Sequence, residues 1–269
     1  MSSNYYESFQ DFLDDVQYSK QGVKRYEWIF GEGYLSTGGL ETTQEIIPLL
    51  ELRPGDRVLD IGCGLGGHDF YMAEKYGAQI DAVDLSKNMM SVALDHFRRK
   101  PHIADKINFR ICDVTDTPFP NDYYDVVYSR DALLHISDKE KLFRRIFNWL
   151  KPGGKIVFTD YCRGDKEHSD EFKKYIAERG YHLFTVNQYE KLLTENGFVN
   201  VKADDWHHKF VESLKRELKK LTDGKTEFLE MFNSEDYGYL EKGWLAKIKR
   251  AKDGDQTWAL CIGVKPKAS

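Results

Sequence analysis

Residues 58–67 read Val-Leu-Asp-Ile-Gly-Cys-Gly-Leu-Gly-Gly, a hydrophobic strand that leads directly into a glycine-rich turn. Glycines let such a turn approach a ligand closely, and the helix expected after the turn directs its free N–H groups at that ligand. Dinucleotide oxidoreductases carry a similar turn. Asp60, two residues before Gly62, disfavours a pyrophosphate and favours a ligand with a cationic end. We therefore expect a nucleoside-type ligand without a pyrophosphate at this turn.

Strand and helix patterns alternate on both sides of the turn. The expected strands span 57–61, 79–83, 107–111, 124–129, 154–160, 198–203 and 257–264. The expected helices between them span 66–76, 87–99, 139–150 and 186–196. A tight turn, Pro152-Gly153-Gly154, is expected before the fifth strand. This alternation predicts an α/β fold with a mostly parallel, seven-stranded sheet and helices on both faces.

The remaining segments are expected to surround one end of this sheet. Residues 5–16 and 20–30 carry the apolar spacing of short helices, and residues 205–251 look helical. We expect a single domain over residues 1–269. Its expected parts are N-terminal lid helices (1–50), a cofactor-binding core (51–160), a polar, tyrosine-rich substrate-binding insertion over the strand ends (161–184), and C-terminal helices with a sheet edge (185–269).

Composition excludes several classes of function. The net charge of −5 argues against a nucleic-acid-binding protein, which is usually basic. The sequence contains no run of about 18 apolar residues, so we expect no membrane span. Residues 1–7 show no apolar signal region. The four scattered cysteines suggest reduced thiols and a cytoplasmic protein. The eight histidines show no metal-ligand spacing, so no metal is expected. The sequence has no coiled-coil heptads that would favour an oligomer, so we expect a monomer.

Polar residues follow four consecutive strands of the predicted sheet. Asp84 ends the second strand, twenty residues after Gly64, which is the spacing of an acid that binds a ribose. Asp113 follows the third strand, and Arg130 with Asp131 follows the fourth. One such acid alone is more often a helix cap or a turn residue. Their joint position at the carboxyl ends of parallel strands, where ligands bind, favours a common site.

This set of motifs resembles the class I methyltransferases that use S-adenosylmethionine, which have a Rossmann-like fold. The resemblance implies that S-adenosylmethionine binds here and leaves as S-adenosylhomocysteine. It also implies contacts to the methionine part (Gly62, Gly64), the ribose (Asp84), and the adenine (Leu85, Asp113, Val114).

A narrower resemblance covers essentially the whole chain. The segments 16–18, 22–40, 128–136, 160–163, 175–181 and 243–247 resemble the phosphoethanolamine N-methyltransferases. Within that family the chain is most similar to the second catalytic domain of the plant enzymes and to the second nematode type. The resemblance implies N-methylation of phosphoethanolamine and/or its mono- and dimethyl derivatives, which yields phosphocholine and S-adenosylhomocysteine.

The family resemblance also implies roles for particular residues. Tyr18 and His135 form a pair in which the histidine orients or deprotonates the tyrosine, and the tyrosine faces the amine. Asp131, four residues before His135, is expected on the same side of a helical turn, where it orients the amine or stabilises its positive charge during methyl transfer. Additional cofactor contacts are implied for Gln17, Tyr26, Leu35, Ser36, Asp60 and Arg130. Whether Arg130 serves the cofactor or the substrate stays open.

The implied substrate is a small phosphate ester with an amine, which calls for cations and hydroxyl donors. The residues implied to bind it are Gln17, Tyr18, Tyr26, Asp131, Tyr161, Tyr175, Arg179, Tyr181 and Lys247. Taken singly, the aromatic side chains could equally pack in the core, and the charged ones could be solvated. Tyr18 alone could be a helix staple, and His135 alone could be a core histidine. Three tyrosines around Arg179 in a polar insertion favour a binding site.

Two other functions remain open from the residues alone. A methyltransferase for another small amine or for a sterol shares the same cofactor motifs, but a sterol requires an apolar pocket without Arg179 and Lys247. A non-catalytic S-adenosylmethionine-binding regulatory subunit does not need Tyr18, Asp131 or His135. No residue decides which of the three methylation steps the chain performs.

Overall fold

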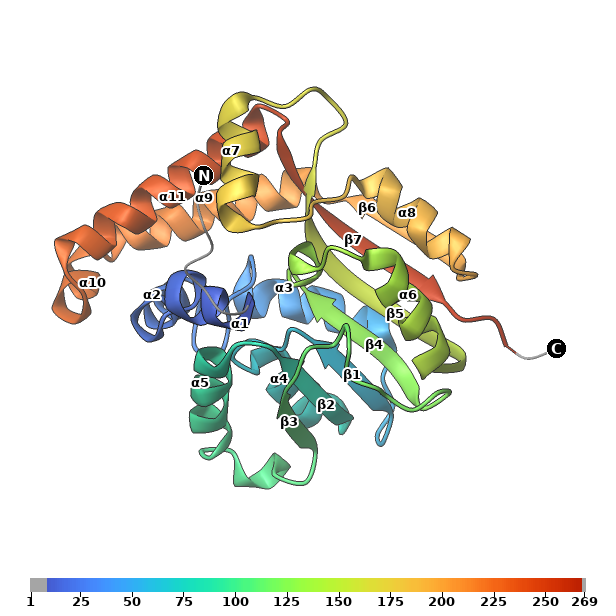
Figure 1. Ribbon diagram of the computed structural model, residues 1–269. Coiled ribbons are helices and arrows are strands. Elements are labelled where there is room, and N and C mark those ends of the chain that lie inside the picture. Colours follow the sequence, from blue (N-terminus) through green and yellow to red (C-terminus); the bar gives the residue numbers. More distant parts are fainter. Residues whose placement is uncertain (1–8, 268–269) are drawn as a thin grey trace.

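The computed structural model describes residues 9–267, except for the side chains of Phe9, Val16, Gln17 and Lys20. At its centre is a seven-stranded sheet of order β3-β2-β1-β4-β5-β7-β6 (Figure 1). The strands are β1 (Arg57–Ile61), β2 (Gln79–Asp84), β3 (Ile107–Ile111), β4 (Tyr124–Arg130), β5 (Leu150–Arg163), β6 (Val199–Asp205) and β7 (Gln256–Val264). Strands β1 to β5 pair in parallel, and β7 runs antiparallel between β5 and β6. The predicted mostly parallel sheet is thus confirmed.

The helices agree with the sequence-based expectation in the core and differ from it at the flanks. They are α1 (Phe9–Phe12), α2 (Lys20–Phe30), α3 (Gly39–Ile46), α4 (Gly67–Tyr76), α5 (Lys87–Phe97), α6 (Lys139–Trp149), α7 (Asp170–Arg179), α8 (Val186–Glu195), α9 (His207–Asp223), α10 (Lys225–Met231) and α11 (Ser234–Lys252). Helix α3 lies in the expected lid segment 1–50 but outside the two helical ranges expected there, and α7 was not expected. The helical segment 205–251 divides into three helices, and Asn233 caps the last of them by accepting from Asp236 N.

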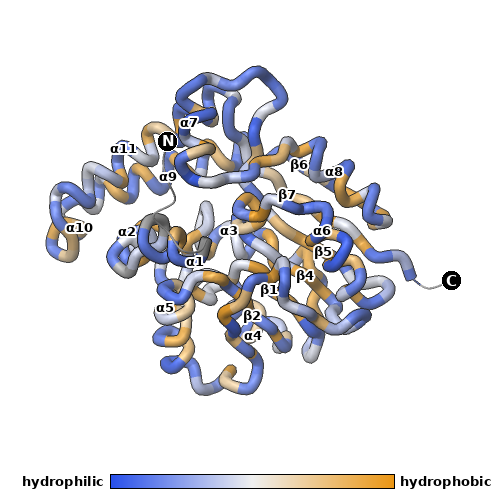
Figure 2. The backbone as a smooth tube through the Cα atoms, in the orientation of Figure 1, coloured by the Kyte–Doolittle hydropathy of each residue, from blue (hydrophilic) through white to orange (hydrophobic). Residues whose placement is uncertain are grey.

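Both faces of the sheet are buried, as a parallel sheet requires. Neighbouring residues of one strand belong to different cores: Leu59 packs with α6 and α8, whereas Val58 packs with α3, α4 and the short turn Ile47–Leu50. Figure 2 shows hydrophobic colours along β1, β4 and β5 and hydrophilic colours along much of the outer helices. The hydrophobic runs in the sequence are therefore explained by burial on two sides.

The fifth strand is longer than expected. The predicted turn Pro152-Gly153-Gly154 lies inside β5, where the pairing with β4 shifts register between Tyr124 and Val126. At its other end β5 continues to Arg163, so Tyr161 belongs to the sheet and not to the insertion. Helix α7 occupies most of the expected insertion.

The remaining helices surround the carboxyl ends of the parallel strands. Helices α9 and α11 pack along each other and are joined by α10, and α7 lies beside the end of α11 (Figure 1). Their apolar faces form a third core around Phe172, Phe210, Trp244 and Trp258. The N-terminal helix α2 contacts α5 and α9. No helix among residues 9–267 has the length and apolar character needed to cross a bilayer.

Candidate active site

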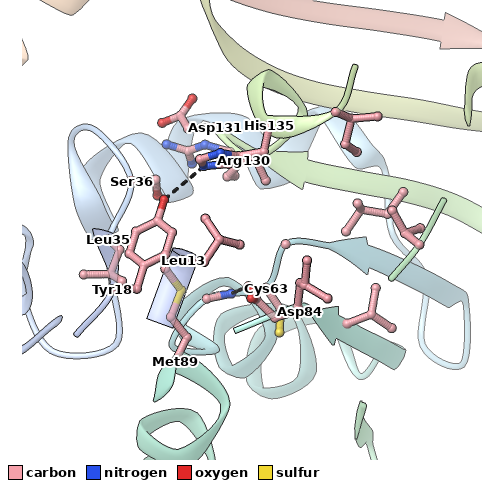
Figure 3. A pocket seen from close by; sticks show the side chains of 18 of the residues that line it. Leu13, Tyr18, Leu35, Ser36, Cys63, Asp84, Met89, Arg130, Asp131 and His135 are labelled. Carbon is pink, nitrogen blue, oxygen red and sulfur yellow. Dashed lines mark hydrogen bonds between the residues drawn. The ribbon is translucent and has the colours of Figure 1, made fainter. Parts of the chain in front are cut away.

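A cavity of about 420 Å³ lies at the carboxyl ends of β1 to β4 (Figure 3). We call it the first cavity. It brings together most of the residues expected to bind the cofactor or to act in catalysis. Of these, its lining includes Tyr18, Leu35, Ser36, Gly62, Gly64, Asp84, Leu85, Asp113, Val114, Arg130, Asp131 and His135.

The glycine-rich turn forms the base of the first cavity. Gly62 has a φ of 77°, and a Cβ there would lie 2.3 Å from Ala132 Cβ, because the segment after β4 passes closely. Gly64 has a φ of 56°, and a Cβ there would meet nothing nearer than Met89 Sδ at 3.8 Å. The space beside Gly64 is therefore cavity, and the positive φ of both residues favours glycine.

Asp84 is held by the backbone around it. Its Oδ2 accepts from Gly64 N (2.9 Å), and its Oδ1 accepts from Ser86 N (2.8 Å). Burial raises its pKa above the usual carboxyl value, because the ionised form loses solvation there. Each carboxylate oxygen keeps a lone pair for a hydroxyl group in the cavity.

Asp60 does not line the cavity. Its side chain is 1% exposed and lies below the turn with Asp69 of α4, which is also fully buried. Burial raises the pKa of Asp60 to about 7, and it raises the pKa of Asp69 as well. The expectation that Asp60 contacts the cofactor therefore does not agree with its position. Asp60 instead forms part of the support beneath the turn.

Arg130 lies on the side of the first cavity and is 4% exposed. Its guanidinium donates to Thr159 Oγ1 (2.9 Å), Thr37 O (3.1 Å) and Thr42 Oγ1 (3.0 Å). It is absent from the lining of the second cavity described below. The sequence left open whether Arg130 serves the cofactor or the substrate, and its position favours the cofactor.

Tyr18 and His135 meet in the wall of the first cavity. The Tyr18 hydroxyl lies 3.1 Å from His135 Nε2, as the dashed line in Figure 3 shows. Burial lowers the pKa of His135 to about 3 and raises the pKa of Tyr18. At neutral pH the imidazole and the phenol are therefore both uncharged. The pair predicted from the family resemblance is present as a hydrogen bond between residues 117 positions apart in the chain.

Asp131 does not lie on a helical turn with His135, contrary to expectation. Its φ is 52°, so the chain turns sharply after β4, and the short helical turn Leu133–His135 begins only afterwards. Its Oδ1 accepts from Thr159 Oγ1 (2.9 Å) and Trp258 Nε1 (2.7 Å). Contacts to β5 and β7, and not helical spacing, place this carboxylate near His135.

A second cavity, of about 400 Å³, adjoins the first. Tyr18, Leu35, Asp131 and His135 line both cavities, and we call them the junction residues. The lining of the second cavity also includes Tyr26, Tyr161, Tyr175, Arg179, Tyr181 and Lys247. All the residues expected to bind substrate thus lie together except Gln17, whose side chain is outside the described part of the chain. Tyr26, expected on the cofactor side too, lines only the second cavity.

Three cations of the second cavity each lie against a phenol group. Lys247 Nζ donates to the Tyr161 hydroxyl (2.8 Å), and burial lowers the pKa of Lys247 to about 8. Arg179 donates to the hydroxyl of Tyr239 (3.3 Å). Arg250, whose guanidinium carbon lies 3.8 Å from the centre of the Tyr175 ring, adds a third cation.

Arg250 and Tyr239 were not among the residues expected from the sequence. A helical signal for Arg250 was present, because it follows Lys247 by three residues on α11 and therefore shares its face. Among residues 9–267, no group of three or more potential metal ligands is close enough to hold an ion.

Comparison with known proteins assigns the family. The phosphoethanolamine N-methyltransferase of Plasmodium falciparum (isolate 3D7) is 42% identical over 254 residues, which are 93% of this chain and 94% of that protein.

The chain belongs to the phosphoethanolamine N-methyltransferase family.

Other members of the phosphoethanolamine N-methyltransferase family are longer. Phosphoethanolamine N-methyltransferase 3 of Arabidopsis thaliana is 47% identical over 262 residues, which are 97% of this chain and 53% of the plant protein. The chain thus spans about half the length of this plant relative.

A solved structure and a family model agree with this assignment. The structure of phosphoethanolamine N-methyltransferase 2 of Haemonchus contortus, in complex with phosphomonomethylethanolamine and S-adenosylhomocysteine, is 36% identical. It superposes with a TM-score of 0.94 over 97% of this chain and 61% of that one. Residues 59–158 match the model of a methyltransferase domain. The fold is therefore that of the class I methyltransferases, as the sequence predicted.

Proposed function

We propose that this chain transfers methyl groups from S-adenosylmethionine to the nitrogen of phosphoethanolamine and/or its mono- and dimethyl derivatives, and that the final product is phosphocholine. The supporting observation is the pair of adjoining cavities. One has the glycine turn and Asp84 at its base, and the other has phenols and cations around it. The junction residues lie where a methyl group would pass from one ligand to the other.

The first cavity suits S-adenosylmethionine, which supplies an electrophilic methyl group when bound. The open space beside Gly64 would admit the methionine part. Asp84 has lone pairs for the ribose hydroxyls. Asp113 uses Oδ1 to accept from the backbone and side chain of Thr115, which leaves Oδ2 for the adenine amino group. The buried Val114 provides an apolar contact for the adenine ring.

The second cavity suits a phosphate ester. Lys247, Arg179 and Arg250 provide positive charge, and Tyr161, Tyr175 and Tyr181 provide hydroxyl groups. The phosphomonomethylethanolamine named in the Haemonchus contortus complex is a ligand of this chemistry. With the phosphate among the cations, the amine of such a small molecule would reach the junction residues.

The amine must have a free lone pair to attack a methyl group. Tyr18 and Asp131 offer oxygens that accept N–H hydrogen bonds, so they orient the nitrogen toward the first cavity. His135 is uncharged at neutral pH because its pKa is low. A ring nitrogen can therefore accept the Tyr18 proton while the Tyr18 oxygen takes a proton from the amine. The low pKa means that the imidazolium would form only transiently.

The alternative functions agree less well with the site. A sterol requires an apolar cavity, whereas Arg179, Lys247 and Arg250 all line the second cavity. A non-catalytic regulatory subunit does not need the hydrogen bond between Tyr18 and His135 or a second cavity next to the first. Both features are explained if the chain is an enzyme.

We also propose that the chain acts as a monomeric single domain in the cytoplasm. The four cysteines are free thiols, and three of them (Cys63, Cys162 and Cys261) are buried. Free thiols agree with a reducing compartment.

The test is methyl transfer from labelled S-adenosylmethionine to phosphoethanolamine, phosphomonomethylethanolamine and phosphodimethylethanolamine, each offered alone. We expect transfer to at least one of them, with phosphocholine formed from the dimethyl form. The three separate rates also identify the steps that the chain performs. If none of the three substrates is methylated, the proposed function is contradicted.

A further inference from the structure

A buried threonine connects the two cavities. Thr37, in the loop between α2 and α3, is 0% exposed. Its backbone N–H donates to Asp131 Oδ2 (3.3 Å), and its carbonyl oxygen accepts from Arg130 (3.1 Å). Its Oγ1 lies 2.7 Å from the hydroxyl oxygen of Tyr161. Thr37 thus contacts one side chain of the first cavity, one junction residue and one wall residue of the second cavity.

The hydroxyl oxygen of Tyr161 has a second neighbour, Lys247 Nζ at 2.8 Å. Burial lowers the pKa of Lys247 to about 8, while Glu217 and Asp131 favour its ammonium form, and Nζ is the donor in this contact. An ammonium has no lone pair and can only donate. Burial raises the pKa of Tyr161 well above its usual value, so the phenol keeps its proton. The Tyr161 oxygen therefore accepts from Lys247 and still has one proton to donate.

The direction of the hydrogen bond between Thr37 and Tyr161 follows from burial. Within residues 9–267, Tyr161 is the hydrogen-bond partner of Thr37 Oγ1, and no other is present. If Tyr161 donated, the Thr37 proton would have no acceptor at a fully buried position, which is strongly unfavourable. If Thr37 donates, its proton is satisfied. The Tyr161 oxygen then accepts twice, and neither Thr37 nor Lys247 accepts the Tyr161 proton.

We propose that Thr37 is a positioning residue that makes Tyr161 a hydrogen-bond donor into the second cavity. Tyr161 is part of the cavity wall, so a proton that no described residue accepts is available to a ligand there. An anionic phosphate oxygen is a strong acceptor for such a proton. This inference rests on the proposed function, because it takes the phosphate of the substrate as that ligand.

A double-mutant cycle tests the inference, with calorimetric titration of phosphocholine into the full chain saturated with S-adenosylhomocysteine. Thr37→Val removes the hydroxyl but keeps the shape and the backbone hydrogen bonds, and Tyr161→Phe removes the donor. We expect Tyr161→Phe to weaken binding about 10-fold and Thr37→Val about 3- to 10-fold, as for one hydrogen bond to a charged group. In the Tyr161→Phe background, Thr37→Val should change the dissociation constant less than about twofold, because no phenol is left to orient.

Three further variants serve as controls. Thr37→Ser retains a hydroxyl and should bind phosphocholine nearly as the wild type does. Thr257→Val removes another buried threonine hydroxyl, which donates to Asp205 and lines neither cavity, and it should leave binding unchanged. If Thr37→Val does not fold, Thr37→Ala repeats the cycle.

Two results would overturn the role of Thr37. One is that Thr37→Val changes the dissociation constant of phosphocholine equally with and without the Tyr161 hydroxyl. The other is that Thr37→Val does not change it when Tyr161 is present. Failure of the wild-type chain to bind phosphocholine also overturns it. The proposed function is decided separately, by methyl transfer to the phosphoethanolamines, so the two failures are distinguishable.

Discussion

The junction residues bring together parts of the chain that are far apart in sequence. The hydrogen bond between Tyr18 and His135 links the N-terminal helices to the loop after β4. Asp131 has a positive φ of 52°, which aspartate adopts more readily than most residues. Thr159 and Trp258 hold its carboxylate, so β5 and β7 determine its direction. Each side of the proposed reaction centre is thus fixed by a different element.

Removing either partner of the tyrosine–histidine pair should slow catalysis more than it weakens cofactor binding. We expect Tyr18→Phe and His135→Ala each to lower kcat about 10²- to 10⁴-fold, the usual contribution of positioned acid–base groups. The dissociation constant of S-adenosylhomocysteine should change only a few-fold, because Asp84 and the glycine turn are untouched. Steady-state kinetics and calorimetry measure the two effects, and near-normal kcat in both variants would contradict the assigned mechanism.

The sequence predicted which side chains line the site better than it predicted how they are held. Nearly all the side chains that the acids at strand ends and the family motifs singled out line one of the two cavities, although they make up fewer than half of the lining residues. Asp60 was misplaced because pattern alone does not show which face of a strand end points to the ligand. Asp131 was assigned to a helical turn that its positive φ excludes. Thr37 was not identified, since its partners Asp131 and Tyr161 are 94 and 124 residues away and leave no local signal.

At the scale of elements, α5 holds the N-terminal segment over the first cavity. The carboxylate of Asp14 accepts from Lys87 N and Asn88 N, each at 3.2 Å, at the first turn of α5. In return, Asn88 Nδ2 donates to the carbonyl oxygens of Asp14 (3.0 Å) and Tyr18 (3.1 Å). One side chain of α5 thereby fixes the backbone that carries the Tyr18 hydroxyl to His135.

Asn88→Ala should loosen this attachment without removing any lining residue. We expect faster amide hydrogen exchange over residues 13–18 and a kcat lowered about 10-fold, because Tyr18 would reach His135 in fewer molecules. Mass-resolved hydrogen exchange and turnover measure the two effects. Asn187→Ala is the matched control, since Asn187 is exposed and bonds only Asp165 among the described residues. Unchanged exchange at residues 13–18 in Asn88→Ala would contradict this role.

Elements with a clear burial pattern were predictable, and elements without one were not. The strands of the parallel core carry continuous apolar runs because both of their faces are buried. Helix α7 buries only Phe172, so it shows no apolar period and was taken for an irregular insertion. The continuation of β5 to Arg163 depends on its pairing with β7, which is far along the chain.

At the scale of the whole molecule, buried ionisable groups below the site link stability to pH. Asp60 and Asp69 lie together beneath the glycine turn, and burial raises the pKa of Asp60 to about 7. In the unfolded chain an aspartate titrates near ~3.9. Between about pH 4 and pH 7 the unfolded chain has therefore lost this proton, whereas the folded chain retains it. This carboxyl group thus lowers the free energy of unfolding as the pH rises through that range.

Replacing Asp60 by asparagine should weaken this pH dependence, because only Asp69 of the pair can then bind a proton. The melting temperature of Asp60→Asn relative to the wild type should be higher at pH 7.5 than at pH 4.5, measured by calorimetry on the protein without ligands. Asp105→Asn, which changes an exposed carboxylate, should show no such trend. If the melting temperatures of Asp60→Asn and the wild type differ by the same amount at both pH values, the raised pKa of Asp60 is contradicted.

The central claim is that the cations and phenols of the second cavity recognise a phosphate while the junction residues present the amine. It is tested most directly by comparing kcat/KM for phosphomonomethylethanolamine and for N-methylethanolamine, which lacks the phosphate. A site built to bind a polar group rejects an analogue without it by large factors, so we predict a preference of at least about 1000-fold for the phosphorylated amine. Comparable kcat/KM values for the two amines would contradict the account.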